Sequence, residues 1–209
     1  MVRRTSGCRA ESPTAGELMA ERGLRRRLAE ANRIDQAVYA AVATTPTPLL
    51  DRAMRRLSEA ANYSRLWIAS SVLLAATAGP RGRLAAESGL ASVAATSALA
   101  NLIVKPVGNR RRPNRGGEEV PVERRITMPG SRSFPSGHAA SAFAFASGTS
   151  RVLPAAGAPL RCLAALVAYS RVHTGVHYPG DAIAGAVGGA AIADLVTARV
   201  VRSLTSCRR

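Results

Sequence analysis

The sequence predicts an all-α protein, a polytopic membrane helical bundle of about five spanning helices with N-terminal amphipathic helices. Two observations predict this class. Hydrophobic residues make up 47% of the 209 residues, and they gather in runs of near-spanning length. Arginines, which supply most of the formal charge of +16, lie mostly at the ends of those runs. A soluble helical bundle with an alanine-rich core is the alternative, because the mean hydropathy is only +0.03.

The first 62 residues are polar and divide into a tail and two helices. Residues 1–16 contain no apolar run and are expected to form a disordered basic tail. Residues 17–62 mix spaced apolar residues with arginines, which predicts amphipathic helices lying on an anionic membrane surface. For 17–44, a solvated helix packed on its own domain is an equally good interpretation. A break at TTPTPLL leads to a second helix that begins near Pro48.

Residues 63–203 are predicted to form the membrane-embedded domain. Trp67 is expected near a membrane interface, and the residues from Pro80 to Arg83 are expected to form a tight turn. Asp194 lies deep in the last run, where a polar contact would have to account for it. Five apolar runs follow one another, at about Leu66–Pro80, Leu84–Val104, Gly137–Val152, Leu160–Ser170 and Ala182–Val201.

The strong positive charge points to an anionic partner, either nucleic acid or a membrane surface. A membrane is the better interpretation, because long apolar runs separate the basic clusters and only 4% of residues are aromatic. Few rings are therefore available to stack on bases, and we expect no nucleic-acid partner. The three cysteines, Cys8, Cys162 and Cys207, form neither a metal motif nor a disulfide framework. The sequence carries no signal for an oligomeric state.

The first of three polar clusters is KPVGNRRRP, at the start of a basic loop of residues 105–135. A loop of this length suggests function. Lys105, the single lysine of the chain, ends the second apolar run, and Arg112 follows close behind. Such cations could neutralise phosphoryl oxygens and the charge of a transition state. A basic loop at a membrane edge is the plainer interpretation.

The second cluster is SFPSGHAASAF. Ser136 can cap the helix that follows, and Gly137 allows the backbone N–H groups at the helix start to approach and hold an anion. His138 would stand in the first turn of that helix, well placed to donate a proton to a leaving oxygen. A capped helix with an incidental histidine is the alternative.

The third cluster is SRVHTGVHYPGD. Arg171 offers a planar fork that suits phosphate oxygens. His177 is expected just before a helix, with Asp181 in its first turn, because Pro179 favours a helix start. The carboxylate could then fix the imidazole tautomer, and such a histidine can act as a nucleophile. His173 lacks an evident partner, and we expect a structural or substrate-entrance role for it.

Together the clusters resemble the type 2 phosphatidic acid phosphatase family, which also includes the vanadium haloperoxidases. The family pattern is a lysine, six residues and Arg-Pro, then Pro-Ser-Gly-His, then Ser-Arg, five residues, His, three residues and Asp. The chain matches every one of these positions, in order and spacing, at Lys105, Arg112, Pro113, Pro135, Ser136, Gly137, His138, Ser170, Arg171, His177 and Asp181.

The resemblance implies a membrane lipid phosphatase that needs no metal and no other cofactor. His177 would attack phosphorus to form a phosphohistidine, Asp181 would orient it, and His138 would protonate the leaving alkoxide. The substrate would be a phosphatidate-like or polyprenyl phosphate, either a monoester or a diphosphate. The residues expected to hold the phosphoryl oxygens are Lys105, Arg112, Ser136, Gly137 and Arg171.

Two other functions remain as alternatives. A vanadate-dependent haloperoxidase would use the same residues, but those relatives are soluble and the apolar runs argue against it. A catalytically silent basic membrane adaptor is disfavoured by the complete set of catalytic residues. An alternating bundle places all three clusters at one face of the membrane. The distribution of arginines predicts that this is the cytoplasmic face of a multi-pass cell-membrane protein.

Overall fold

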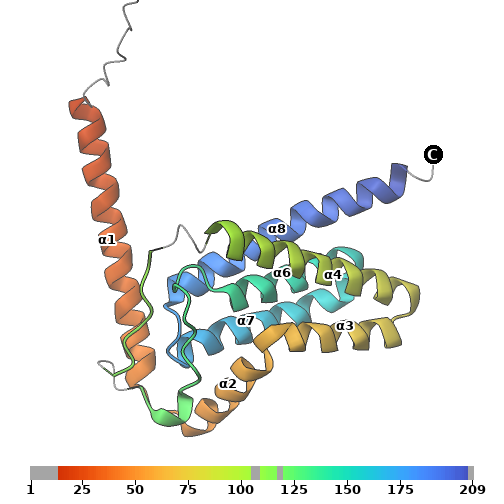
Figure 1. Ribbon diagram of the computed structural model, residues 1–209, viewed down its shortest axis with the longest axis horizontal. Coiled ribbons are helices and arrows are strands. Elements are labelled where there is room, and N and C mark those ends of the chain that lie inside the picture. The colour runs from red at the N-terminus through yellow and green to blue at the C-terminus, as the bar shows by residue number, and fades with distance from the viewer. Residues whose placement is uncertain (1–13, 105–108, 117–119, 207–209) are drawn as a thin grey trace, which may run out of the picture.

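The computed structural model describes residues 14–104, 109–116 and 120–206. Within these residues the chain forms seven α-helices and no strand, which confirms the predicted all-α class (Figure 1). A 3-10 turn at Asn62–Ser64 precedes the bundle, and a π-helical turn at Ala100–Val104 extends its second helix. The helices are α1 (Ala15–Thr44), α2 (Pro48–Ala60), α3 (Arg65–Thr77), α4 (Gly79–Leu99), α6 (Gly137–Val152), α7 (Gly157–His173) and α8 (Pro179–Ser206).

Five of these helices correspond to the five predicted apolar runs and form a bundle in which consecutive helices run antiparallel (Figure 1). Helix α6 is central and packs against α4, α7 and α8, while α3 packs against α4. Two of the five, Gly79–Val104 and Pro179–Arg199, are long and apolar enough to cross a bilayer by themselves. Helices α3, α6 and α7 have 13, 16 and 17 residues, below the roughly 20 of a complete span.

Close contact between α6 and α8 depends on two glycines of α8 that lie four residues apart, Gly185 and Gly189. A Cβ atom at Gly185 would lie 2.4 Å from the carbonyl oxygen of Ser136. A Cβ atom at Gly189 would lie 2.1 Å from the carbonyl oxygen of Ala140. The two backbones therefore approach more closely than any side chain would permit.

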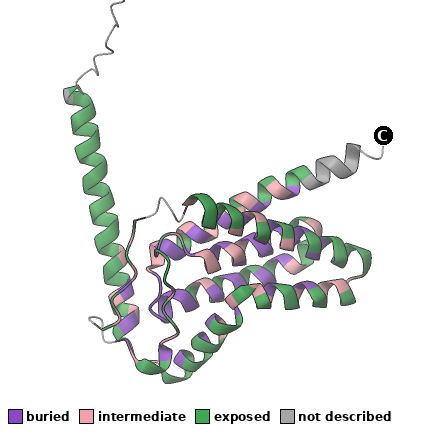
Figure 2. Ribbon diagram, viewed as in Figure 1, coloured by how far each residue is buried: buried purple, intermediate pink, exposed green. Residues whose placement is uncertain are grey.

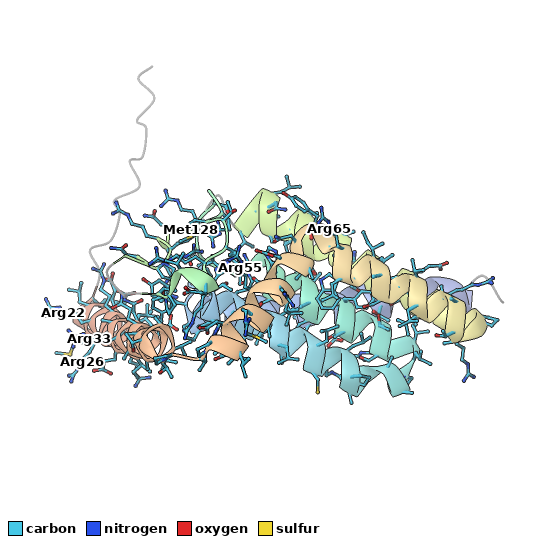
Figure 3. All side chains as sticks on the ribbon, turned by 90° about the horizontal axis from the view of Figure 1, so that it is seen from below. Arg22, Arg26, Arg33, Arg55, Arg65 and Met128 are labelled. Atoms are coloured by element: carbon cyan, nitrogen blue, oxygen red, sulfur yellow. The ribbon has the colours of Figure 1, made fainter. Side chains whose placement is uncertain are left out.

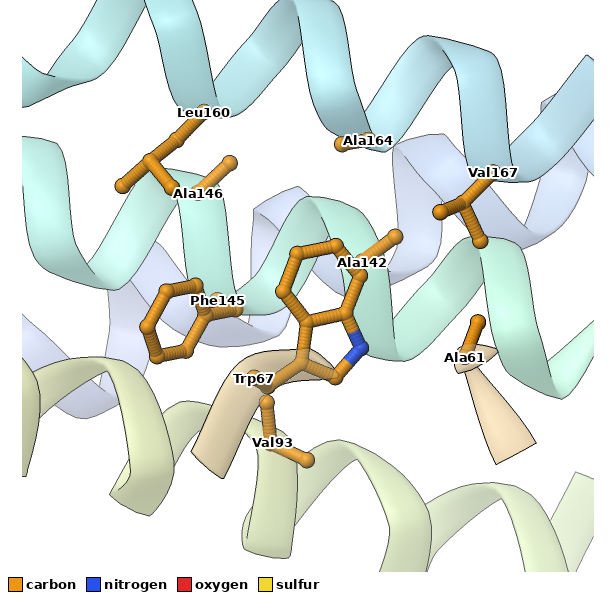
Figure 4. Close-up of a cluster of buried hydrophobic side chains, with 9 residues drawn as sticks. All are labelled: Ala61, Trp67, Val93, Ala142, Phe145, Ala146, Leu160, Ala164 and Val167. Atoms are coloured by element: carbon orange, nitrogen blue, oxygen red, sulfur yellow. The ribbon is translucent and has the colours of Figure 1, made fainter. Parts of the chain in front are cut away.

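The core of the bundle is a cluster of buried apolar residues between α3, α4, α6 and α7 (Figure 4). Trp67 lies in its middle, 1% exposed, with its ring centroid 5.4 Å from that of Phe145. The expectation of an interfacial tryptophan is therefore wrong. The alanines of α6 leave the space that the indole fills, so this side of α3 faces protein.

The turn between α3 and α4 is tighter than predicted. Gly79 has a positive φ of 59°, which a residue without Cβ adopts at little cost, and it reverses the chain. Pro80 occupies the first turn of α4, where its missing N–H is not needed. Pro80 and Arg83, expected in the turn, therefore belong to the helix.

Helix α1 crosses the axes of the bundle helices at one end of the molecule (Figure 1). Residues 16–34 are exposed, so this part of α1 packs little on the described remainder of the chain, although Asn32 accepts a hydrogen bond from Arg110 Nη2 at 3.0 Å (Figure 2). A capping box between Thr14 and Glu17 fixes its start, within the segment that the sequence assigns to the tail. Residues 1–13 lie outside the described residues.

A buried ionic cluster joins α2, the loop and α7. Asp51 is paired with Arg124, at 2.7 Å from the guanidinium Nε, and with His173, at 2.8 Å from the imidazole Nε2. Arg124 is fully buried and also donates to the carbonyl oxygens of Val42 and Thr45. His173 thus has a partner that the sequence did not reveal. The cluster fixes the α1–α2 connection against the end of α7.

Asp194 also has a polar partner. Its carboxylate pairs with Arg151 at 2.7 Å, and both side chains are about half exposed. The pair lies at the end of the bundle away from α1, because Arg151 is in the last turn of α6. This ion pair is the polar contact that the sequence analysis expected for Asp194 without naming the partner.

Candidate active site

The three polar clusters meet at the end of the bundle that α1 crosses (Figure 1). Helices α6 and α8 begin there, α7 ends there, and the described parts of the loop, residues 109–116 and 120–136, cover that end. The backbone N–H of Ser136 donates to the carbonyl oxygen of Asp181 at 2.9 Å, which joins the second cluster to the third. Lys105 lies outside the described residues.

His177 lies in the short connection between α7 and α8, and Asp181 lies in the first turn of α8, as predicted. Gly175 has a φ of 71°, which lets the chain turn back after α7. The backbone N–H of His177 then donates to the carbonyl oxygen of Arg171 at 3.2 Å. His177 is only 2% exposed, so its ring is held in a fixed place.

A hydroxyl group connects Asp181 to His177. Ser133 donates to Asp181 Oδ2 at 2.5 Å and lies 3.5 Å from His177 Nδ1. The direct separation of Nδ1 from Oδ2 is 3.6 Å, which is longer than a hydrogen bond. Asp181 therefore acts on the imidazole largely through Ser133, and this arrangement favours the tautomer with its proton on Nδ1.

The other ring nitrogen faces a guanidinium group. Arg112 Nη1 lies 3.1 Å from His177 Nε2 and donates to the carbonyl oxygen of Val176 at 2.7 Å. Its Nε donates to the carbonyl oxygen of Ser131 at 2.8 Å. With the proton on Nδ1, the Nε2 lone pair points at the cation. This is the place where an anion would have to bind to be attacked by the ring.

Burial, together with the positive charges of Arg112 and Arg171, lowers the pKa of His177 from 6.5 to about 4, against the opposing effect of Asp181. The ring is therefore neutral at neutral pH, which is the form that carries a nucleophilic lone pair.

Arg171 is 1% exposed, and its Nη1 donates to the hydroxyl group of Ser58 on α2 at 2.6 Å. Its Nε has no hydrogen-bond partner among the described residues. A buried N–H donor without an acceptor is costly, and an anion beside His177 would satisfy it. Arg171 thus has a buried N–H donor without an acceptor, as expected of a residue that holds phosphoryl oxygens.

The start of α6 has the predicted form. Ser136 is the N-cap residue, and its hydroxyl accepts from the backbone N–H of Ala139 at 3.4 Å. Gly137 opens the helix, and both it and His138 line a cavity of about 240 Å³. His138 Nε2 lies 2.9 Å from the side-chain oxygen of Asn62. His138 therefore stands at the cavity rather than in the hydrogen-bonded group around His177.

Three residues that sequence reasoning did not assign belong to this network. Ser133 is one. Arg110 Nη1 donates to Asp181 Oδ1 at 2.9 Å, and its Nη2 donates to Asp35 of α1 at 2.5 Å. Asp35 also accepts from the backbone N–H of Gly180 at 2.6 Å. Arg110 belongs to the first polar cluster and Ser133 to the second, but nothing in the sequence connects Asp35 with either of them.

In the part of the chain that the structure describes, no three His, Cys, Asp or Glu side chains are grouped closely enough to hold a metal ion. The cations around His177 are instead supplied by arginines from two different elements. Arg112 comes from the loop and Arg171 from the end of α7.

Sequence comparison decides the family. Residues 87–204, more than half of the chain, match the PAP2 superfamily. The chain belongs to the PAP2 superfamily. The match includes all three motifs, and it confirms the predicted membership in the type 2 phosphatidic acid phosphatase family. No curated protein matches the sequence.

Two solved structures share the fold. LpxE from Aquifex aeolicus is 23% identical, with a TM-score of 0.63 over 77% of this chain and 93% of that chain. A transmembrane PAP2-type phosphatidylglycerolphosphate phosphatase from Bacillus subtilis is 24% identical, with a TM-score of 0.62 over 83% of this chain and 87% of that chain. The predicted membrane helical bundle is confirmed by this likeness.

Proposed function

We propose that this PAP2 protein is a membrane-bound phosphatase that hydrolyses a lipid phosphate monoester or diphosphate through a phosphohistidine intermediate. The proposal rests mainly on the groups that surround the two ring nitrogens of His177. Its Nδ1 side is fixed by Ser133 and Asp181, while Nε2 faces the Arg112 guanidinium 3.1 Å away. A neutral ring held in this way presents one lone pair to a site of positive charge.

In the first step the Nε2 lone pair of His177 forms a bond to phosphorus as the bond from phosphorus to the ester oxygen breaks. The leaving oxygen takes that electron pair and receives a proton from His138, so an alcohol leaves. In the second step a water oxygen attacks phosphorus and gives a proton to His138, and the N–P bond breaks. Phosphate is released and the neutral His177 ring is restored.

The phosphoryl oxygens are held by fixed donors in this proposal. Arg112 exchanges its contact with His177 for one with the phosphate, and the free Nε of Arg171 gains an acceptor. The backbone at Gly137, together with Ser136, offers N–H groups at the start of α6. Lys105 is assigned to the same set from its position in the motif.

We place residues 63–203 in the membrane as the phosphatase domain and residues 17–62 at its surface. At about 3.6 residues per turn, Leu24 and Leu28 share one side of α1 and lie opposite Arg22, Arg26 and Arg33. Those arginines point away from the bundle (Figure 3). The apolar side then rests on the lipid. In anionic vesicles, an environment-sensitive label at Leu24→Cys is expected to report apolar surroundings. The same label at Arg26→Cys is expected to report aqueous surroundings.

The active site faces the cytoplasm of a multi-pass cell-membrane protein in this proposal. It shares an end of the bundle with the arginine-rich α1 and loop, and the positive-inside rule places such segments in the cytoplasm. Cysteines introduced in residues 120–130 of intact cells test the orientation. Protection from an impermeant thiol reagent is expected, and labelling would reverse the assignment.

Phosphate release from a panel of lipid phosphates by the purified protein, in the presence of a chelator, tests the activity. His177→Ala is expected to abolish release while the protein stays inserted and folded. An acid-labile phosphoprotein should form with wild-type protein and not with the variant. Near-normal turnover by His177→Ala would disprove the mechanism. If the wild-type protein releases phosphate from none of the lipids, the catalytically silent membrane adaptor is the better interpretation.

A further inference from the structure

The end of α2 contacts the proposed active site at two points. Ser58, in the last turn of the helix, accepts a hydrogen bond from Arg171 Nη1 at 2.6 Å. Asn62, in the 3-10 turn that follows, has its side-chain oxygen 2.9 Å from His138 Nε2. The partners lie 113 and 76 residues further along the chain. One short element therefore contacts both the proposed phosphate-binding arginine and the proposed acid.

The buried side of α2 carries polar groups. Its buried residues are Asp51, Met54 and Ser58, whose spacing places them on one face of the helix. A buried polar group is costly unless it is paired, and both polar residues have partners on α7. Asp51 pairs with His173, and Ser58 pairs with Arg171. A helix that only closed the bundle would gain more from apolar side chains at these positions.

Backbone strain follows Asn62 directly. Tyr63 and Ser64 have positive φ values of 54° and 57°. Such backbone is unfavourable for residues with a Cβ atom, persists only where surrounding structure imposes it, and is concentrated at functional sites. On the other side of Asn62, Ala61 is 4% exposed and packs in the bundle core. The turn therefore holds Asn62 against His138 at a cost in backbone conformation.

The contact with Asn62 determines how the His138 ring is held. The side-chain oxygen of an amide accepts hydrogen bonds and cannot donate, so Nε2 carries the proton in this contact. A hydrogen bond on one ring nitrogen fixes the tautomer and the orientation of an imidazole. A general acid is effective only when its ring lies within reach of the leaving oxygen. Asn62 thus supplies the fixed orientation that the proposed acid requires.

The contact with Ser58 holds one end of the Arg171 guanidinium group. Ser58 is 0% exposed and Arg171 is 1% exposed, so this hydrogen bond is shielded from water. The same Nη1 lies 3.5 Å from the backbone carbonyl oxygen of Ser58. A cation that is already fixed where negative charge gathers needs no rearrangement during the reaction. Ser58 thus orients Arg171 before a phosphoryl group binds.

We propose that the end of α2 is a positioning element of the active site, in which Ser58 fixes Arg171 at the phosphoryl group and Asn62 fixes His138 at the leaving oxygen. This inference rests on the proposed phosphatase function. The element precedes residues 87–204, which match the family, so that match does not assign it. Both residues act through their partners and do not contact the substrate.

Kinetics on two esters test Asn62. Asn62→Leu removes the acceptor and nearly keeps the side-chain volume. The kcat for dodecyl phosphate should fall about tenfold, and that for nitrophenyl phosphate, whose leaving group needs no proton, by less than about twofold. In a His138→Ala background the same substitution should have no further effect on dodecyl phosphate. An equal loss on the two esters would indicate a merely structural role and overturn the assignment of Asn62.

The Ser58 contact predicts a different result, because the phosphoryl group is common to both esters. Ser58→Ala should lower kcat/KM about tenfold on both, and orthovanadate, which mimics phosphate, should inhibit about tenfold more weakly. Ser71→Ala is the matched control, since Ser71 is 5% exposed but donates to the carbonyl oxygen of Trp67 in its own helix. Its kinetics and vanadate inhibition should stay at wild-type values.

Unchanged vanadate inhibition in Ser58→Ala would overturn the assignment of Ser58, and so would an equal weakening in Ser71→Ala. If Ser58→Ala does not fold, Ser58→Cys provides the second test, because a thiol of similar size is a weak acceptor. Full activity of both Ser58→Ala and Asn62→Leu would overturn the positioning element alone. Failure of the wild-type protein to hydrolyse either ester, together with no phosphoprotein, would overturn the phosphatase function itself.

Discussion

Asp35 of α1 and Asp181 of α8 share one guanidinium group, that of Arg110. The contacts are 2.5 Å to Asp35 and 2.9 Å to Asp181, and Asp35 also binds the backbone N–H of Gly180. Burial opposes the charge of Arg110, but the two carboxylates outweigh it and raise the pKa of Arg110 above its ordinary value. The N-terminal helix, which lies outside the bundle, is thereby attached to the residue that orients the proposed nucleophile.

We predict that Asp35→Asn lowers kcat about tenfold with little change in KM, because the loss of a hydrogen bond to a charged group would let Arg110 and the start of α8 shift. Asp35 is a positioning residue, so phosphoprotein formation should slow in the same proportion. Glu30→Gln is the control, since the ion pair of Glu30 in the described chain is with exposed Arg26 on the same helix. Equal activity of the two variants would show that Asp35 has no such role.

The local features of the site were predictable because each is encoded within one helical turn. The serine cap at Ser136, the position of His177 before a helix and that of Asp181 in its first turn all follow from short spacings. The five bundle helices likewise follow from the lengths of apolar runs. Helix ends and apolar runs are determined by neighbouring residues, so the sequence contains them directly.

The partners across the fold were not predictable. Asp35 lies 75 residues from Arg110, and Asp51 lies 122 residues from His173. No local pattern specifies which turn of α1 or α2 meets the end of the bundle. Trp67 was misplaced for a related reason. Helix α3 is apolar on all sides, and hydropathy does not distinguish a side that faces lipid from one that faces protein.

The pKa of His177 gives a prediction about pH. Burial, followed by the charges of Arg112 and Arg171, lowers this pKa to about 4, so the ring should stay neutral well below the ordinary value of 6.5. Because the unfolded chain takes up a proton near 6.5 and the folded chain does not, the free energy of unfolding should fall as the pH drops from 6.5 towards 4.

Nitrogen NMR of the imidazole rings measures this directly, since the chain has only three histidines. One ring should remain neutral to about pH 4, and His177→Gln should remove its signal. Arg112→Gln should raise the pKa of His177 without restoring 6.5, because burial remains. A His177 signal that titrates at or above 6.5 would contradict the described environment.

The proposed role of His138 predicts a dependence on the leaving group. A general acid contributes roughly 10²–10⁴-fold when the leaving alkoxide is a strong base, and much less when it is a weak one. His138→Ala should therefore reduce hydrolysis of alkyl phosphates far more than that of nitrophenyl phosphate. Rates of both esters for wild type and variant provide the comparison. An equal loss on the two esters would argue against proton donation by His138.

The contact between α6 and α8 predicts opposite outcomes for two adjacent glycines. Gly189→Ala places a Cβ atom 2.1 Å from the carbonyl oxygen of Ala140, so the helices must separate, at a cost of about 1–3 kcal/mol. Gly188→Ala meets no atom within 4 Å and exchanges glycine for a better helix former, a gain of up to about 1 kcal/mol. Thermal unfolding in detergent micelles should rank Gly189→Ala below wild type and Gly188→Ala at or above it. If both variants unfold at the wild-type temperature, α6 and α8 do not pack with their backbones in contact.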